Sequence, residues 1–428
     1  YCAVMVVLQP GISPDPCGGA AGSGSVAGLV TDEQDQSVAG VEVQLSGQAD
    51  MSYMTDESGN YEFAGLIEGY DYSLTPSLDA QHLNGVSTFD LVLISKHILG
   101  VKPLGSPYKL IAADVNNSKS ITTLDLIQLR KLILSVETKF SNNTSWRFVQ
   151  RDYAFPNAGN PWTETFPEVV NINNLPAEQL IRDFVAIKVG DVNGNARPNA
   201  LAGTEIRNVA GTFRVQVAEA ALTAGEEYTV DFTAGDLSQV QGYQFTLGLD
   251  RNAVELVDVI YGVATEDHFG VFAEEGLLTT SWNGEAADDA VLFSLVLRAK
   301  QDVELSRTLR VSSRLTTAEA YGQADELLDV ALDFGAGTLS RAGFELYQNY
   351  PNPFRGQTLI SFHLPEATMA TVKVNDVNGR LLKVINGQFN QGYNELRLNS
   401  SELQAAGVLY YTVETAEYTA TKKMIIIE

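Results

Sequence analysis

The sequence predicts a mainly β, multidomain protein, with tandem β-sandwiches of Ig-like or jelly-roll type and one small pair of α-helices among them. Its 428 residues are enough for about three domains. Short runs of alternating apolar and polar residues, bounded by Gly, Asn and Asp, recur along most of the chain and are typical of sandwich strands. The exception is a helical pattern that begins at Asp90 and recurs at Asp125, 35 residues later.

Composition excludes several classes of function. Hydrophobic residues make up 45% of the chain, which is enough to bury packed cores and excludes wholesale disorder. Lys and Arg number 28 against 53 Asp and Glu, so the formal net charge is -25. This charge repels phosphate backbones and anionic lipid, so we expect no nucleic-acid partner. No apolar run is long enough for a transmembrane helix, so we expect no membrane insertion.

Residues 1–24 read as an N-terminal strand followed by a linker. The apolar run Cys2–Leu8 precedes a stretch rich in Pro, Gly, Ala and Ser. Because the first residue is Tyr1 rather than Met, we expect a targeting peptide to have been removed. In an oxidising compartment, Cys2 and Cys17 would form a disulfide that stabilises the fold by about 3 kcal/mol; the alternative is a pair of free thiols.

Residues 25–77 contain four short alternating strands separated by turn residues such as Gly59 and Asn60. This pattern predicts a small β-sandwich. It resembles the transthyretin-like, carboxypeptidase-regulatory-like modules of secreted multidomain proteins. The resemblance implies a spacer, and no catalytic constellation lies in this segment.

Residues 78–200 contain the helical repeat, with apolar positions at helical spacing in Asp90–Leu99 and Asp125–Leu134, each after a polar loop. This loop–helix duplication resembles the dockerin family, whose loops bind calcium in the manner of EF-hands. Calcium takes six to eight oxygen ligands, which a 12-residue loop presents from positions 1, 3, 5, 7, 9 and 12. In the second loop these positions are filled by Asp114, Asn116, Ser118, the backbone of Ser120, Thr122 and Asp125. Lys119 stands where a Gly normally makes the sharp turn.

The first loop is less complete. Its six positions are Asp79, Gln81, Leu83, Gly85, Ser87 and Asp90, and Leu83 cannot ligate a cation. In both loops the alternative is a metal-free turn in which the hydroxyl residue and the aspartate only cap the helix. Asp191, Asn193 and Asn195 have the spacing of positions 1, 3 and 5, but no helix follows them. They either complete a shared calcium site or form a plain Asn/Gly turn.

Residues 140–183 hold several aromatic side chains, among them Trp146, Phe148, Tyr153, Phe155, Trp162 and Phe166, interleaved with Pro and Asn residues. We expect an irregular insertion that covers the helical pair with a small core of its own. The alternative is a surface on which Trp and Tyr stack against sugar rings.

Residues 201–340 predict an all-β sandwich with strands recurring about every ten residues. The run Gly242–Asp250, followed by Val254–Val259, resembles cohesin domains, as does Leu277–Trp282 with the strand after it. A cohesin is a binding module without catalytic residues.

Residues 341–428 carry the most specific motifs. Phe344–Phe354, Val372–Arg380 and Lys422–Ile427 follow one another in the order and spacing of the C-terminal sorting domain of type IX secretion in Bacteroidota. The resemblance implies a seven-strand sandwich and export to the outer-membrane surface of a Gram-negative bacterium or beyond, with the type IX machinery as a partner. Read without the resemblance, the segment is a small β-domain with an exposed apolar last strand.

The modules together predict a non-enzymatic secreted protein, because no nucleophile elbow, His-Glu-x-x-His motif or phosphate loop is present. We expect a structural subunit of a cell-surface filament, rigidified by calcium and assembled from copies of itself through head-to-tail module contacts or strand exchange. The alternative is a surface-anchored adhesin or carbohydrate-binding scaffold that binds glycans or other surface proteins. In that case, the helical pair packs against its own chain as a calcium-stapled joint.

Overall fold

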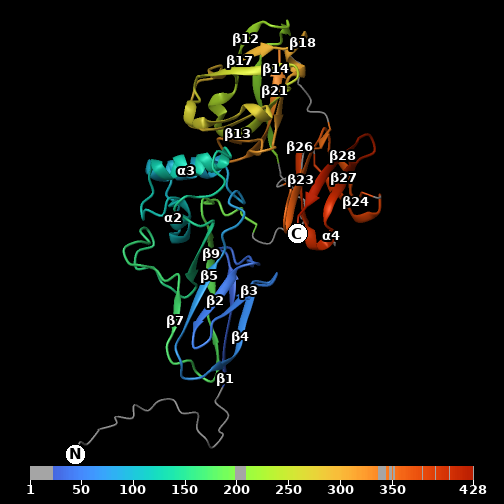
Figure 1. The fold of residues 1–428 in the computed structure, drawn as a ribbon. Coiled ribbons are helices and arrows are strands. Elements are labelled where there is room, and N and C mark those ends of the chain that lie inside the picture. The colour runs from blue at the N-terminus through green and yellow to red at the C-terminus, as the bar shows by residue number, and fades with distance from the viewer. Residues whose placement is uncertain are drawn as a thin grey trace, which may run out of the picture. The chain divides into compact units, whose positions relative to one another are not determined.

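The computed structural model describes residues 23–197, 209–335, 344–346, 349, 352–377, 379–390, 392–403 and 405–427. The predicted fold class, mainly β and multidomain with few helices, is confirmed (Figure 1). The expected N-terminal strand and the pair Cys2 and Cys17 lie outside the described residues. The chain divides into two compact units, one of which holds the described residues up to Leu78 with Arg147–Phe155 and Thr165–Ala186. Within the described residues, no helix is long and apolar enough to cross a membrane.

The first unit is a β-sandwich. One sheet has the order β4 (Asn60–Ile67), β1 (Ser23–Thr31), β9 (Phe184–Lys188) and β6 (Trp146–Gln150), with β8 (Gln179–Ile181) also on β1. The other has the order β3 (Met51–Met54), β2 (Glu42–Gly47), β5 (Tyr72–Ser77) and β7 (Val170–Ile172). Inward side chains such as Val26, Leu45 and Phe63 are buried at every second position, as the alternating pattern predicts.

The segment 140–183 corrects one expectation. Much of it does not cover the helical pair: β6 extends the first sheet by pairing with β9, which follows the segment, β8 joins β1, and β7 pairs with β5. Residues 147–155 and 165–183 therefore belong to the sandwich that begins at residue 23, whereas residues 140–146 and 156–164 belong to the unit of the helical pair, where the ring centre of Phe140 lies 5.6 Å from that of His82. Local patterning missed this because each of the added strands is only three to five residues long.

The second unit begins with the helical pair, α1 (Thr88–Ile98) and α3 (Thr123–Ile133), separated by a short helix, α2 (Pro107–Ala113). The pair lies where the repeat predicted helices. Each helix starts at a capping box, with Ser87 and Asp90 at α1 and Thr122 and Asp125 at α3. The capping role proposed as an alternative to metal binding is therefore present in both helices.

A large sandwich, which we call the central sandwich, follows. Its strands are β10 (Gly211–Val217), β11 (Ala221–Leu222), β12 (Glu227–Thr233), β13 (Val240–Leu249), β14 (Val254–Tyr261), β15 (Phe269–Phe272), β16 (Leu277–Asn283), β17 (Val291–Ala299), β18 (Val303–Glu304), β19 (Leu309–Ser312), β20 (Glu319–Gly322) and β21 (Leu327–Phe334). Most pair in the order β14-β17-β12-β10-β21-β20-β13-β16-β15. The first and last strands of the domain, β10 and β21, pair in parallel. Phe213, Phe232 and Phe245 are fully buried in its core.

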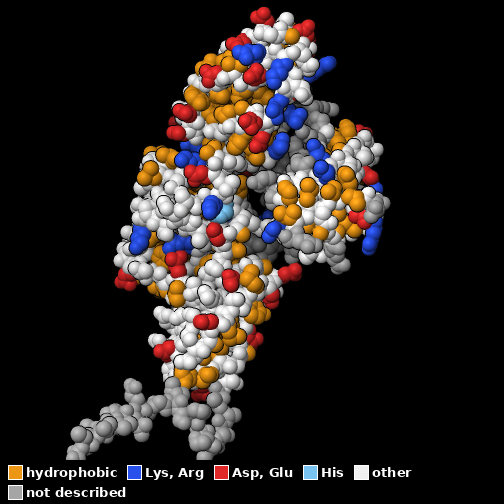
Figure 2. Space-filling model, in the orientation of Figure 1, with side chains coloured by type: hydrophobic (Ala, Val, Ile, Leu, Met, Phe, Trp, Pro, Cys, Tyr) orange, Lys and Arg blue, Asp and Glu red, His pale blue; other side chains and the backbone are white. Residues whose placement is uncertain are grey.

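In the described part of residues 344–427, the C-terminal sandwich has seven strands, the number expected for a sorting domain. One sheet has the order β22 (Glu345–Leu346), β23 (Gln357–Leu364) and β26 (Gly392–Asn399). The other has the order β25 (Leu381–Phe389), β24 (Thr368–Asp376), β27 (Gly407–Glu414) and β28 (Thr419–Ile426), and α4 (Ser400–Leu403) follows β26. The last strand is not an exposed apolar strand: β28 pairs with β27 along its whole length, and Met424 is buried. Figure 2 shows hydrophobic side chains on the viewed face of this sandwich.

Candidate functional site

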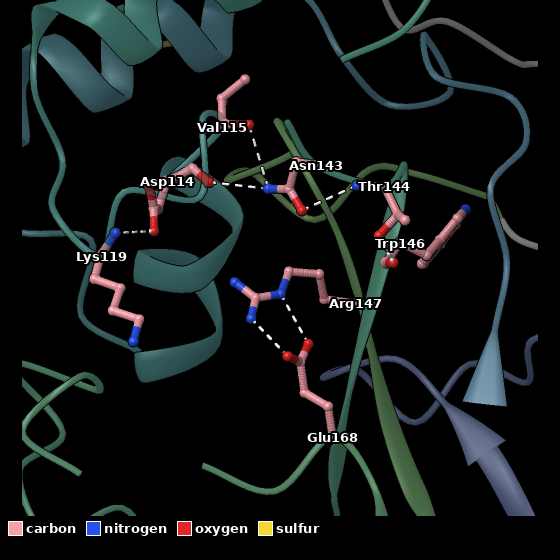
Figure 3. Close-up of polar contacts among 8 residues, drawn as sticks. All are labelled: Asp114, Val115, Lys119, Asn143, Thr144, Trp146, Arg147 and Glu168. Carbon is pink, nitrogen blue, oxygen red and sulfur yellow. Dashed lines mark hydrogen bonds and ion pairs between the residues drawn. The ribbon is translucent and has the colours of Figure 1, made fainter. Parts of the chain in front are cut away.

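The loop between α2 and α3, which we call the continuous loop (residues 114–125), is drawn together around Asp114. One carboxylate oxygen of Asp114 accepts from the backbone N–H of Ser118 at 2.8 Å, and the other accepts from that of Lys119, also at 2.8 Å. Asn116 Oδ1 accepts from the same Ser118 N–H at 2.9 Å. The side-chain amide of Asn143 holds the other side of the loop, donating to the carbonyl of Asp114 at 3.1 Å (Figure 3).

Lys119 makes the sharp turn that a glycine would normally make. Its φ is +67°, and that of Asn117 is +57°. These left-handed values are strained for residues with a Cβ, and the loop keeps them despite the departure in sequence. The continuous loop therefore has the turn at its sixth position that an EF-hand loop requires.

Asp125 closes the continuous loop from the first turn of α3. Its Oδ2 accepts from the backbone N–H of Thr122 at 2.8 Å, which is the helix cap, and its Oδ1 accepts from that of Asn116 at 3.1 Å. The hydroxyl of Ser118 donates to the carbonyl of Ser120 at 3.1 Å. Asp114 and Asp125 are both fully buried. The structure thus links all six predicted oxygen donors in one loop.

The first loop is different. Asp79 Oδ1 accepts from the backbone N–H of Ser145 at 2.8 Å and lies 3.3 Å from Nε2 of His82, with about half of its side chain exposed. Leu83 is 40% exposed. Positive φ values fall at Gln81 and Gly85, not at the positions that carry them in the continuous loop. Asp79 and Asp90 are therefore held by different partners, and the expected ligand run does not fold as a second copy of the continuous loop.

Asp90 instead faces the loop after β9. Its Oδ1 accepts from the backbone N–H of Val192 at 2.9 Å and of Asn193 at 3.3 Å, while its Oδ2 accepts from that of Ser87 at 2.9 Å. Asp191 accepts from the N–H of Gly194 and of Ala196, both at 2.7 Å. We call residues 191–196 with Ser87 and Asp90 the split loop.

The split loop repeats the hydrogen-bond pattern of the continuous loop. Asp191 corresponds to Asp114, since each binds the N–H of the residue five positions later through its Oδ2. Asn193 accepts from Asn195 at 2.9 Å, as Asn116 does from Ser118. Asp90 takes the place of Asp125. The Asp-x-Asn-x-Asn spacing indicated this loop, but its helix lies about 100 residues earlier in the sequence.

The split loop buries two carboxylates together. Asp90 is fully buried and Asp191 is 7% exposed. Burial raises the pKa of Asp90 well above its usual value, and the charge of Asp191 raises it further. Burial also raises the pKa of Asp191, although backbone N–H donors and the charge of Lys188 oppose the rise. The ammonium of Lys188 donates to the carbonyls of His82 and Val189, and burial lowers its pKa to about 7.

Both loops offer oxygen donors of mixed kind. Among the described residues, no group of three or more His, Cys, Asp or Glu side chains is placed to hold a metal ion. Each loop instead combines two buried aspartates with amide, hydroxyl or backbone oxygens. This is the donor chemistry that calcium prefers, and it does not suit zinc.

The N-terminal end of α1 docks on the central sandwich. The backbone N–H of Thr88 donates to Oε1 of Gln244 at 2.6 Å, and its hydroxyl lies 2.6 Å from that of Ser281. The ring of Phe89 stacks on that of Tyr321 with centroids 5.2 Å apart. Thr88 and Ser281 are fully buried.

The C-terminal end of α3 docks on the same sandwich. The guanidinium of Arg130 donates to Oδ1 of Asn283 at 2.5 Å. Thr279 donates through its hydroxyl to the carbonyl of Leu134 at 2.7 Å, and Thr316 donates to that of Ile133 at 2.6 Å. These bonds satisfy carbonyls that the end of a helix leaves free. The helical pair and the central sandwich thus form one contact within a single chain.

The aromatic residues of the segment 140–183 point largely inward. Trp146, Phe148 and Phe166 are buried. The guanidinium of Arg147 lies 5.1 Å from the ring centre of Phe166 and pairs with Glu168 through two bonds of 2.8 Å (Figure 3). These three rings are therefore closed to a sugar.

Residues 348–427 match the family model described as the secretion system C-terminal sorting domain. The chain is therefore similar to this sorting-domain family over its C-terminal part. It is accordingly secreted through the type IX system to the cell surface or the extracellular space, as predicted, and the type IX machinery is one of its partners. No curated protein is similar enough to this chain to count as a relative.

About three tenths of the chain is also similar to solved structures of cohesins. A type I cohesin–dockerin complex of Clostridium thermocellum, that of OlpC with dockerin 435, is 14% identical over 30% of this chain and 94% of the other, with a TM-score of 0.24. The seventh ScaB type I cohesin of Pseudobacteroides cellulosolvens is 18% identical over 29% and 88%, with a TM-score of 0.23. A non-cellulosomal cohesin of Archaeoglobus fulgidus is 16% identical over 28% and 86%, with a TM-score of 0.22. The dockerin and transthyretin-like resemblances stay predictions.

Proposed function

We propose that this chain is a non-enzymatic structural protein of the bacterial surface, in which the helical pair and the central sandwich form a rigid joint closed within one chain. The observation that carries the proposal is the burial of Thr88 against Gln244 and Ser281, residues that lie far from it in the sequence. A joint of this kind suits a secreted protein that must hold its modules at a fixed angle outside the cell.

The joint has both apolar and polar support. Its stacked ring pair, Phe89 and Tyr321, lies beside buried hydrogen bonds. Removing one partner of such a bond leaves a buried polar group unsatisfied, which destabilises the fold by about 1–3 kcal/mol. Lys96 and Lys102 pair with Asp325 at 3.5 and 3.4 Å on its more exposed side. Exposed ion pairs of this kind add little to the affinity of the helical pair for the central sandwich, but they set the orientation in which the two dock.

Calcium binding is the second part of the proposal, with one ion in the continuous loop and one in the split loop. The ligands would come from Asp114, Asn116, Ser118, Ser120, Thr122 and Asp125 in the first case, and from Asp191, Asn193, Asn195, Ser87 and Asp90 in the second. A bound cation would neutralise the buried aspartates of each loop, and at the split loop it would add to the charge of Lys188. Asp79 is not in either set, because Ser145 and His82 hold it.

The absence of catalysis is also part of the proposal. Among the residues that the structure describes, one arrangement that resembles a catalytic one joins Asp79, His82 and Ser145. Its serine hydroxyl is buried and accepts from the backbone N–H of Ala80 at 2.8 Å. A hydroxyl held in this way cannot reach a substrate, so this cluster supports the fold.

Titration calorimetry of the metal-stripped chain tests calcium binding. We expect two ions with dissociation constants of roughly 10⁻⁵ to 10⁻³ M, and the loss of one ion in each of Asp114→Asn and Asp191→Asn. Asp79→Asn is the matched control and should keep both ions. Failure of the wild-type chain to bind calcium would overturn this part of the proposal.

Assembly of copies into a filament is the second candidate function. The contact between the helical pair and the central sandwich favours it, because two complementary faces on one chain can be exchanged head to tail between copies. Negative-stain microscopy with and without a chelator separates the two candidates. Fibres that fray on chelation support exchange, whereas single particles at all concentrations support the closed joint.

A further inference from the structure

One lateral edge of the first sandwich is open. β3 ends its sheet and pairs only with β2 among the described strands, with Met51 opposite Leu45 and Tyr53 opposite Val43. Leu45 and Val43 are fully buried. Because directly opposed residues share a face of the sheet, Met51 and Tyr53 also face the core. They are nevertheless 41% and 39% exposed.

The opposite edge of the same sheet is closed. Val170 and Ile172 of β7 also lie opposite buried residues of β5, and they are only 4% and 3% exposed. At the open edge, the ring of Tyr53 lies 6.2 Å from that of Phe63 in β4, the edge strand of the other sheet. The core of the sandwich therefore reaches solvent between β3 and β4, along an edge that we call the open seam.

β3 lacks the features that usually keep an edge strand from pairing, which are charges, Pro and bulges. Its sequence is Met-Ser-Tyr-Met, and its pairing with β2 is regular. Met54, on its outer face, is 57% exposed. Across the seam, β4 carries the exposed Glu62 and an irregular pairing with β1. An added strand that is apolar on both faces would cover β3 without burying a charge.

The chain contains such a strand in Cys2–Leu8, which we call the N-terminal run. It is apolar at every position and includes three valines, which favour strands. Residues 9–22 connect it to β1, and 14 extended residues reach about 46 Å. β1 begins at Ser23 opposite Ile67 of β4, and β4 contacts β3. The run can therefore return along β3, where its tether gives it an effective concentration in the millimolar range.

We propose that the N-terminal run pairs with the free edge of β3 in its own chain and closes the open seam. It adds a fifth strand to the sheet β3-β2-β5-β7, and the side chains on one of its faces cover Met51 and Tyr53. This inference goes beyond the proposed function and depends on neither calcium nor the joint. Pairing of this kind leaves β3 closed to a second copy of the chain.

Methionine oxidation of the full-length chain tests this inference. Dilute hydrogen peroxide is added to the folded chain, and mass spectrometry of its peptides gives the oxidation rate at each methionine. The rate follows the exposure of the sulfur. Met369 in the C-terminal sandwich is 58% exposed and serves as the internal reference. With the run in place, Met51 and Met54 should react at least about threefold more slowly than Met369.

Charges in the N-terminal run supply the test variant. Neighbouring residues of a strand point to opposite faces, so in the double variant Val6→Asp, Val7→Asp one carboxylate faces the core in any register. We expect this variant to release the run and to raise the rates at Met51 and Met54 to that of Met369. Ile12→Asp, Ser13→Asp in the connecting segment is the matched control and should keep the protection.

The inference is overturned if Met51 and Met54 of the wild type react as fast as Met369, or if the variant in the run keeps their protection. Loss of protection in the control variant also overturns it. Protection that increases with protein concentration would place the run of a second copy on β3 and contradict pairing within one chain. Deletion of residues 1–9 replaces the double variant if the latter does not fold, as judged by circular dichroism.

Discussion

Asp90 accepts a hydrogen bond from the backbone N–H of Val192 at 2.9 Å, across 102 residues of sequence. The same aspartate caps α1 through its other oxygen, which accepts from Ser87. A local capping box and a long-range contact therefore share one carboxylate. This arrangement makes the start of α1 sensitive to changes in a loop that lies far from it in the chain.

Gly85, just before α1, lies close to the backbone of Ala196 in the split loop. A Cβ added at Gly85 would lie 2.5 Å from the Cα of Ala196, and its φ is +74°. We expect Gly85→Ala to destabilise the chain by more than about 2 kcal/mol and to weaken calcium binding at the split loop, because the backbones must separate. Thermal unfolding and calorimetry measure the two effects.

Gly105→Ala is the matched control for this prediction. Its φ is +79°, but an added Cβ would meet nothing within 4 Å. It should therefore show the backbone strain alone, roughly 1–2 kcal/mol, with both calcium ions retained. Equal effects of the two substitutions would show that the contact with Ala196 does not matter.

Lys119 is expected to lower both the stability of the continuous loop and its calcium affinity. Lys119→Gly should stabilise the loop by about 1 kcal/mol, because glycine adopts a φ of +67° without strain, and should raise its calcium affinity. Lys119→Ala removes the charge but keeps the strain. If both variants raise the affinity equally in calorimetry, the charge and not the strain is responsible.

Thr88 anchors the docking contact through its hydroxyl. Thr88→Val keeps the shape of the side chain but leaves Ser281 without this partner, so we expect the stability of the joint to fall by about 1–3 kcal/mol in chemical denaturation. Thr123→Val, the same substitution at the matching exposed position of α3, should change stability by less than about 0.5 kcal/mol. A larger effect at Thr123 would contradict the assigned contact.

The contact between His268 and Thr265 should weaken in acid. Burial, and then the charge of Arg130, lowers its pKa to about 4, and its Nδ1 accepts from the backbone N–H of Thr265 at 3.0 Å. The unfolded chain takes up this proton below about pH 6.5, whereas the folded chain takes it up only near pH 4. The contribution of His268 to the free energy of unfolding is therefore fully present above pH 6.5 and is lost as the pH falls from 6.5 to 4.

After allowance for solvent screening, the loss at His268 should be about 1 kcal/mol. The stability difference between wild type and His268→Asn, measured in excess calcium across this range, isolates the residue, because Asn keeps an acceptor that does not titrate. A difference that does not change with pH would show that His268 is already protonated in the fold or is not buried.

The local features of this fold were predictable and the long-range ones were not. Ser87 and Thr122 stand three residues before an aspartate and an apolar run, so the two helix starts follow from the sequence. The partner of Asp90 is Val192, and no local pattern records a contact of that range. The strands β6–β9 were missed for the same reason, since their pairing with β1 and β5 is decided by tertiary contacts.

Disulfide trapping between positions 88 and 281 tests the closed joint most directly. The hydroxyls of Thr88 and Ser281 lie 2.6 Å apart, which is close enough for paired cysteines to form a disulfide. With Cys2 and Cys17 replaced by Ser, the full-length variant Thr88→Cys, Ser281→Cys should give an intrachain disulfide on a non-reducing gel, at the mobility of a monomer. A ladder of covalent oligomers, or no disulfide at all, would contradict a joint closed within one chain.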